Sequence, residues 1–140
     1  MNVTDQRISH ELRVRYNECD AQGIVFNANW LMYSDVVMTE FWRQTIGGYQ
    51  HLSESLNVET VVAETGSRYR GIARFDDVLT FVARVTRLGR SSMRVEIESQ
   101  KGDELLYQGF LEYVFVDAHT LTPVPIPDRI REILQVPADS

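Results

Sequence analysis

One segment, from about Asn27 to Ile46, restricts the folds open to this chain more than any other feature. Large apolar residues recur through it at helical spacing: Trp30, Leu31, Tyr33, Val36, Val37, Met38, Phe41, Trp42 and Ile46. On a helix they cover roughly 220° of the circumference, more than the ~100° stripe of a helix packed on one side. Asn27 and Asn29 are good N-cap residues, and Gly47 and Gly48 suit the C-terminus. We therefore expect a long helix that is largely enclosed.

Most of the remaining chain shows the apolar and polar alternation of half-buried strands. Strands are expected over residues 10–16, 61–75, 79–86, 93–97 and 105–116, with a bulge or bend at Gly66 and a hairpin over residues 88–91. A short amphipathic helix is expected over residues 128–134. Strands segregated from a single long helix predict an α+β fold, in which an antiparallel sheet wraps around a central helix.

Several apolar surfaces in this arrangement have no partner within one chain. A single sheet covers only one side of the helix, and the last strand, residues 105–116, is apolar on both faces. Since a second copy would bury these surfaces, we expect a homodimer or a homotetramer.

Composition limits the class of protein. At 140 residues the chain suits a single domain, residues 1–140. The apolar fraction is 44% and no apolar run approaches the ~18 residues of a membrane span. The segment MNVTDQRISH has no signal-peptide pattern, and Cys19 is the single cysteine, so we expect a cytoplasmic protein. A net charge of −6 argues against nucleic acid as a partner.

Two segments carry a resemblance to a known family. VRYNECDAQGIVFNANWLMYSDVVMTEFW, residues 14–42, places an acidic residue in a glycine-containing loop that leads into the long helix. YRGIARFDDVLTFVARV, residues 69–85, places an aromatic residue and an aspartate turn before an alternating strand. With the order of elements over about residues 8–117, they resemble hotdog-fold acyl-CoA thioesterases of the 4-hydroxybenzoyl-CoA thioesterase type.

The resemblance implies hydrolysis of an acyl-CoA thioester in a site between two subunits. By position, Asp20 would be the catalytic carboxylate, and the backbone N–H of Asn27 would polarise the thioester carbonyl. Such chemistry needs a nucleophile or base and a place for the oxyanion, which a carboxylate beside a helix N-terminus can supply. Whether Asp20 attacks the carbonyl or activates water stays open. Coenzyme A would be part of the substrate, and no separate cofactor is expected.

The substrate-binding residues are inferred from the long helix and from one hairpin. We expect Trp30, Tyr33 and Val37 of the long helix to line the acyl pocket together with strand residues of a second chain. Arg87, Arg90, Ser91 and Ser92 surround Gly89 and suit either the phosphates of coenzyme A or a solvated hairpin tip.

Other chemistries lack the residues that they need. The sequence has no nucleophile elbow and no glycine-rich nucleotide loop. His10, His51, His119 and Cys19 show no metal-ligand spacing, so no metal is expected. Two alternatives remain: a hotdog hydratase or dehydratase, which normally pairs an acid with a histidine, and a non-catalytic acyl-CoA-binding dimer. The acyl group and the oligomer size are left open.

Overall fold

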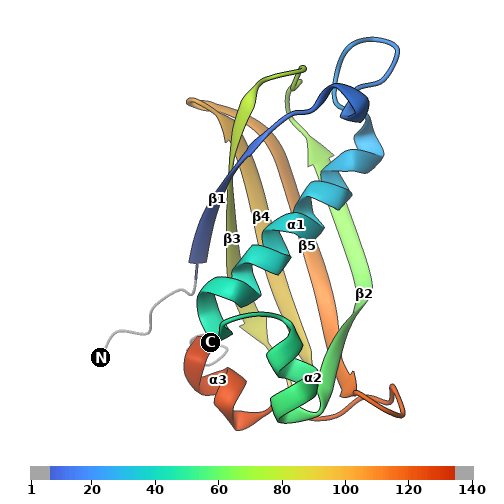
Figure 1. The fold of residues 1–140 in the computed structure, drawn as a ribbon, viewed down its shortest axis with the longest axis vertical. Coiled ribbons are helices and arrows are strands. Elements are labelled where there is room, and N and C mark those ends of the chain that lie inside the picture. The colour runs from blue at the N-terminus through green and yellow to red at the C-terminus, as the bar shows by residue number, and fades with distance from the viewer. Residues whose placement is uncertain (1–6, 135–140) are drawn as a thin grey trace.

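The fold places a five-stranded antiparallel sheet around one long helix. The computed structural model describes residues 7–134. Along the chain the elements are β1 (Arg7–Arg13), the short 3-10 helix η1 (Tyr16–Glu18), α1 (Asn27–Ile46), α2 (Gln50–Leu56), β2 (Val58–Tyr69), β3 (Val78–Leu88), β4 (Ser92–Lys101), β5 (Glu104–Asp117) and α3 (Asp128–Leu134). Figure 1 shows α1 crossing the concave face of the sheet, with α2 and α3 near its C-terminal end.

The sheet has the strand order β1-β3-β4-β5-β2, and every neighbouring pair is antiparallel. β1 and β2 are therefore its two edges. The predicted alternation is confirmed in β3, where Leu79, Phe81, Ala83 and Val85 face α1 and are buried. The same face of β4 carries Met93, Val95 and Ile97, and the buried side chains of the sheet and of α1 form one core. The expected α+β architecture is confirmed.

The long helix begins and ends where the sequence predicts, at Asn27 and Ile46. Gly47 ends it with φ 90°, a left-handed conformation that glycine adopts without strain. Its inner face is buried, but Leu31, Met32 and Val36 on the other side are each more than 40% exposed. Within one chain the helix is therefore enclosed on only part of its circumference.

The first and last residues of several helices and strands differ from the prediction. β1 begins and ends three residues earlier than the expected strand 10–16, and α2 was not predicted. β2 ends at Tyr69 instead of continuing to residue 75, because the chain leaves the sheet to pass the start of α1. The register of β2 shifts between Val62 and Glu64, so the bulge expected at Gly66 was misplaced. At Gly66 a Cβ would lie 2.4 Å from Cε1 of Phe110, so any larger residue there would displace the Phe110 ring from the backbone.

Candidate active site

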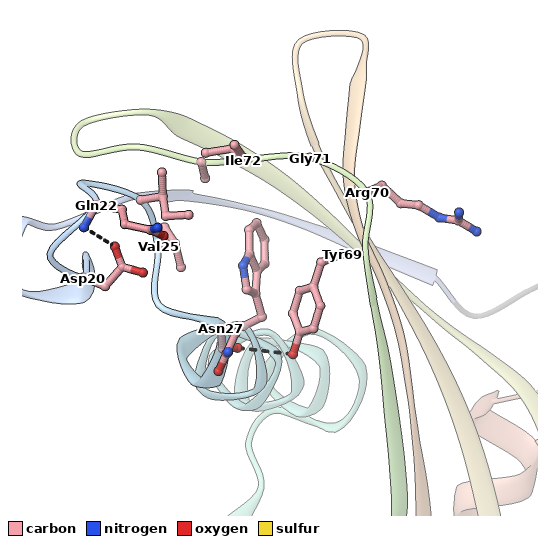
Figure 2. Close-up of a pocket in the computed structure, with 11 residues that line it drawn as sticks. Asp20, Gln22, Val25, Asn27, Tyr69, Arg70, Gly71 and Ile72 are labelled. Carbon is pink, nitrogen blue, oxygen red and sulfur yellow. Dashed lines mark hydrogen bonds between the residues drawn. The ribbon is translucent and has the colours of Figure 1, made fainter.

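A cavity of about 540 Å³ opens where three segments meet at the N-terminal end of α1. The loop before α1, the first turn of α1 and the segment that follows β2 all contribute to it (Figure 2). Its lining consists of Asp20, Gln22, Ile24, Val25, Asn27, Trp30, Tyr69, Arg70, Gly71, Ile72 and Ala73. Both residues that the sequence nominated for catalysis, Asp20 and Asn27, therefore lie in one cavity.

Asp20 begins a tight turn that its own backbone and side chain stabilise. Its N–H donates to the carbonyl of Ile24 at 2.8 Å, and its carbonyl accepts from the N–H of Gly23 at 2.9 Å. Oδ1 accepts from the N–H of Gln22 at 2.8 Å, and Gly23 supplies the positive φ of 79° that closes the turn. In residues 7–134, Oδ2 has no hydrogen-bond partner. One carboxylate oxygen thus orients the side chain, while the other has no partner among the described residues.

Three further contacts hold this loop in place. Cys19 pairs with Val25 across the loop, and the N–H of Val25 donates to the carbonyl of Ala73 at 2.9 Å. Ile24 pairs with Arg74 in an isolated bridge. The loop that carries Asp20 is therefore fixed both to itself and to the segment after β2, which forms the opposite wall of the cavity.

The first turn of α1 presents backbone donors to the cavity. The N-cap is Phe26, with φ −63° and ψ 138°, and no side chain caps the helix. This overturns the prediction that Asn27 and Asn29 are caps: Asn27 is the first helical residue, and Nδ2 of Asn29 donates instead to the carbonyl of Glu18 at 2.7 Å. Among the described residues, the N–H groups of Asn27 and Ala28 reach no acceptor. Unpaired N–H groups and the helix dipole both favour negative charge there.

Glu18, a residue that the sequence analysis did not single out, is the buried acid of this region and only 4% exposed. Its Oε1 accepts from the N–H of Arg15 at 2.7 Å and from the hydroxyl of Tyr33 at 2.8 Å, and its Oε2 accepts from Nε of Arg15 at 2.8 Å. Burial alone raises the pKa of this carboxyl, but the bonds from Arg15 and Tyr33 outweigh it and hold the pKa below its ordinary value. Burial and the bond to Glu18 raise the pKa of Tyr33, which stays protonated. The available sequence signal was the placement of Arg15 and Glu18, two opposite charges three positions apart.

The floor of the cavity is aromatic. Trp30, 3% exposed, lies parallel to Tyr107 with ring centroids 5.0 Å apart and an interplanar angle of 7°. The hydroxyls of Tyr107 and Ser67 are 2.7 Å apart and hydrogen-bonded, which fixes the ring beneath Trp30. Tyr33 and Val37, expected beside Trp30 in the acyl pocket, are buried in the core of the chain and do not line this cavity. Trp30 alone of the three reaches it.

The four residues predicted for phosphate binding lie elsewhere in the chain. Arg87, Arg90, Ser91 and Ser92 are in and beside the β3–β4 hairpin, at the opposite end of the sheet from the start of α1 (Figure 1). Nη2 of Arg87 donates to Oε1 of Glu112 at 2.9 Å, and the carbonyls of Arg90 and Ser91 accept from Ile126 and Phe115. One chain does not bring them to the cavity.

The arginine at the mouth of the cavity is Arg70. Its backbone belongs to the wall, while its guanidinium points away from the cavity (Figure 2). Nε of Arg70 donates to Oε1 of Gln108 at 2.9 Å.

The remaining reactive side chains do not form a competing site. Within the described part of the chain, no group of three His, Cys, Asp or Glu side chains is arranged to hold a metal ion. Burial, followed by the charge of Asp20, raises the pKa of the Cys19 thiol, which disfavours the nucleophilic thiolate. In residues 7–134 no helix is both long and apolar enough to cross a membrane.

Comparison with known proteins gives a consistent result. The profile described as Thioesterase superfamily matches residues 22–107, beginning two positions after Asp20. The acyl-CoA thioesterase YbgC of Haemophilus influenzae is 25% identical over 129 residues, which cover 92% of this chain and 95% of that protein. Among solved structures, a thioesterase superfamily protein from Jannaschia sp. CCS1 superposes with a TM-score of 0.88 at 22% identity, over 99% of both chains. A 1,4-dihydroxy-2-naphthoyl-CoA thioesterase from Synechocystis gives 0.82 at 13% identity, over 91% of this chain and 95% of that one.

Proposed function

This chain belongs to the thioesterase superfamily, has the hotdog fold and is a thioester hydrolase, and from that premise we propose how it hydrolyses an acyl-CoA to a free acid and coenzyme A. The observation that carries the proposal is that two residues lining one cavity each have a free polar group in the part of the chain described: Asp20 has a carboxylate oxygen without a partner, and Asn27 has a backbone N–H without an acceptor. Coenzyme A enters as part of the substrate.

The reaction follows from two groups. The Asn27 N–H donates to the thioester carbonyl oxygen and stabilises the negative charge that develops there. Asp20 either takes a proton from a water that attacks the carbonyl carbon, or attacks that carbon itself to give a mixed anhydride that water then cleaves. In both routes the C–S bond breaks with its electron pair on sulfur, and the thiolate of coenzyme A leaves. A good leaving group makes a strong general acid unnecessary.

The substrate is placed by the shape of the cavity. An acyl group that enters between Asp20 and Tyr69 ends against Trp30, whose ring is held by Tyr107. The closed aromatic floor favours a compact acyl group over a long chain. The phosphates of coenzyme A lie outside the cavity, where Arg70 and, from a neighbouring chain, the Arg87 to Ser92 hairpin are candidates to contact them.

We place the second chain of a homodimer on β2. In the described part of the chain this twelve-residue edge strand pairs with β5 alone, and Val61 and Val62 on it are exposed. A second chain would also bury the exposed apolar residues of α1, which are Leu31, Met32 and Val36. An exposed apolar edge strand is a template for pairing with another chain. Association of two such dimers would give the tetramer that the sequence also allows.

A hydratase or dehydratase reaction and passive acyl-CoA binding remain the alternatives. Against the first, none of His10, His51 and His119 lines the cavity. Against the second, acyl-CoA binding alone does not require an oriented carboxylate beside an uncapped helix start.

One assay separates the three. Purified protein is incubated with aromatic, short-chain and long-chain acyl-CoAs while free thiol is followed, and the wild type is compared with Asp20→Asn. We expect thiol release by the wild type and a loss of at least ~10²-fold in Asp20→Asn, since catalytic acid–base groups contribute ~10² to 10⁴. Equal release by both proteins removes Asp20 from the mechanism. Water addition without thiol release indicates a hydratase, and retention of intact acyl-CoA indicates a binding protein.

A further inference from the structure

The buried carboxylate of Glu18 joins the loop of Asp20 to the long helix. Glu18 closes η1, two residues before Asp20, and its Oε1 accepts from the hydroxyl of Tyr33, in the second turn of α1. Tyr33 is itself 1% exposed, so both ends of this bond are shielded from water. Such a bond is strong relative to its solvent-exposed equivalent because water does not compete for either group.

The backbone of Glu18 makes two more bonds to the same helix. Its carbonyl accepts from the N–H of Phe26 at 3.0 Å and from Nδ2 of Asn29 at 2.7 Å. Glu18 is thus tied to the N-cap, the first turn and the second turn of α1. The loop from Cys19 to Val25 is closed by its own pairing. The position of Asp20 in this loop is therefore fixed by the contacts between Glu18 and α1.

The contact with Arg15 is of a different kind. The Arg15 side chain is 74% exposed, and an ion pair at the surface contributes little because solvent screens it. The N–H of Arg15 and the hydroxyl of Tyr33 both donate to Oε1, and of these two donors only Tyr33 lies on α1. The bond between Tyr33 and Glu18 is therefore the link that joins helix to loop.

We propose that Glu18 is a positioning residue, which through its bond with Tyr33 fixes the carboxylate of Asp20 relative to the N–H of Asn27. This inference rests on the proposed function. Glu18 touches neither the cavity nor the substrate, and its role is to hold the reacting groups within the ~0.5 Å tolerance that an active site requires. A misplacement of ~1 Å can lower a rate by ~10²-fold, so a single buried hydrogen bond at this joint has a large effect on turnover.

Tyr33→Phe tests the link by removing one oxygen atom and leaving the ring in the core. We expect kcat to fall by ~10-fold, within the range that small misplacements produce, while KM stays within about twofold because no substrate contact is lost. The matched control is Tyr113→Phe. Tyr113 is also a buried tyrosine facing α1, its hydroxyl has no hydrogen-bond partner in the described residues, and it lies outside the cavity. We expect it to keep the wild-type kcat.

A second pair of variants examines Glu18 itself. In Glu18→Gln the amide oxygen can still accept from Arg15 N–H and from Tyr33, while the amide nitrogen faces the exposed guanidinium, which can turn to water. Glu18→Ala leaves neither acceptor. A positioning role predicts that Glu18→Gln retains most of the kcat and Glu18→Ala loses at least as much as Tyr33→Phe. This comparison also serves if Tyr33→Phe does not fold.

A double-mutant cycle separates positioning from a general effect on the fold. If Tyr33 acts through Asp20, adding Tyr33→Phe to Asp20→Asn lowers the residual kcat no further. Equal losses in both backgrounds, or a wild-type kcat in Tyr33→Phe, overturn the inference. If Asp20→Asn is inactive while Tyr33→Phe is normal, the positioning role alone fails. If Asp20→Asn is fully active, the proposed catalytic role of Asp20 fails and the positioning role fails with it.

Discussion

Replacing Asn27 with proline removes one backbone N–H from the cavity and changes little else. Asn27 is the first residue of α1, where proline is well tolerated because its fixed φ suits the helix and its missing N–H has no helical partner. Phe26 before it has ψ 138°, inside the range of about +120° to +160° that a residue before proline prefers. In residues 7–134 the Asn27 N–H reaches no acceptor, so no bond of the fold is lost.

The expected magnitude follows from the role of that N–H. Losing one donor to a developing oxyanion lowers kcat by ~10² to 10³-fold, which corresponds to about 2.7–4 kcal/mol. The free energy of unfolding should stay within about 0.5 kcal/mol of the wild type, because proline at the first helical position removes no hydrogen bond of the fold and needs no change in the backbone. Asn27→Pro is therefore expected to lose activity while keeping its stability.

The measurement compares kcat and urea unfolding for wild type, Asn27→Pro and Asn27→Ala. Asn27→Ala removes the same side chain but keeps the N–H, so we expect it to retain nearly the wild-type kcat. If Asn27→Pro and Asn27→Ala turn over substrate equally while both are folded, the donor to the oxyanion is another group, and the reasoning from the helix start is wrong.

Three more predictions follow from the cavity, the buried acid and the edge strand. Trp30→Leu lowers the floor of the cavity and should raise kcat/KM for longer acyl-CoAs relative to short ones; an unchanged ratio in a chain-length series contradicts a floor at Trp30. Because the pKa of Glu18 is lower in the folded chain than its ordinary value of about 4.3, the ionised carboxylate stabilises the fold above that pH, and this contribution is lost as the pH falls through the folded pKa. The difference in free energy of unfolding between wild type and Glu18→Gln should therefore be largest near neutral pH and shrink toward pH 3 in urea titrations, and a constant difference contradicts it. Val62→Lys places charge on the edge of β2 and should convert the dimer to monomers in sedimentation experiments, whereas Glu11→Lys on the opposite edge strand should not; a dimer that survives Val62→Lys does not use this edge.

The fold was predictable where the pattern is long and regular. Twenty residues of helical spacing located α1 to the residue, and strict alternation identified the inner face of β3. The chain leaves β2 at Tyr69 for reasons of tertiary structure, since residues 70–77 pass the start of α1, where Ala73 accepts a bond from Val25. Such a departure has no local sequence signal. Gly66 shows the same limit, because the ring that packs against it belongs to Phe110, 44 positions away.

The candidate site divides in the same way. Asp20 and Asn27 are close in sequence and share one loop and helix, so the resemblance could nominate both. Tyr33 and Val37 were grouped with Trp30 because a helical projection gives the face but not the depth of burial. Glu18 was missed because its bond to Tyr33 joins a loop to a helix turn fifteen residues on, and only the folded chain brings them together.

The first residues of α1 are those expected at a functional site and differ from those that would make the helix most stable. Two asparagines stand near its start, and an asparagine at the N-cap stabilises a helix by ~1 kcal/mol relative to an apolar residue. The chain instead places Phe26 at the cap and uses the Asn29 side chain to hold Glu18, so within residues 7–134 the N–H of Asn27 stays unpaired in the cavity that Asp20 also lines. The first turn also has no acidic side chain that would neutralise the helix dipole. Local rules for helix stability are broken at the end that faces the cavity, which is where a functional site is expected to break them. If that reasoning holds, Phe26→Ser, which supplies a cap to compete for the same N–H groups, should stabilise the fold while lowering kcat; a stabilised variant with unchanged kcat would show that these donors take no part in the reaction.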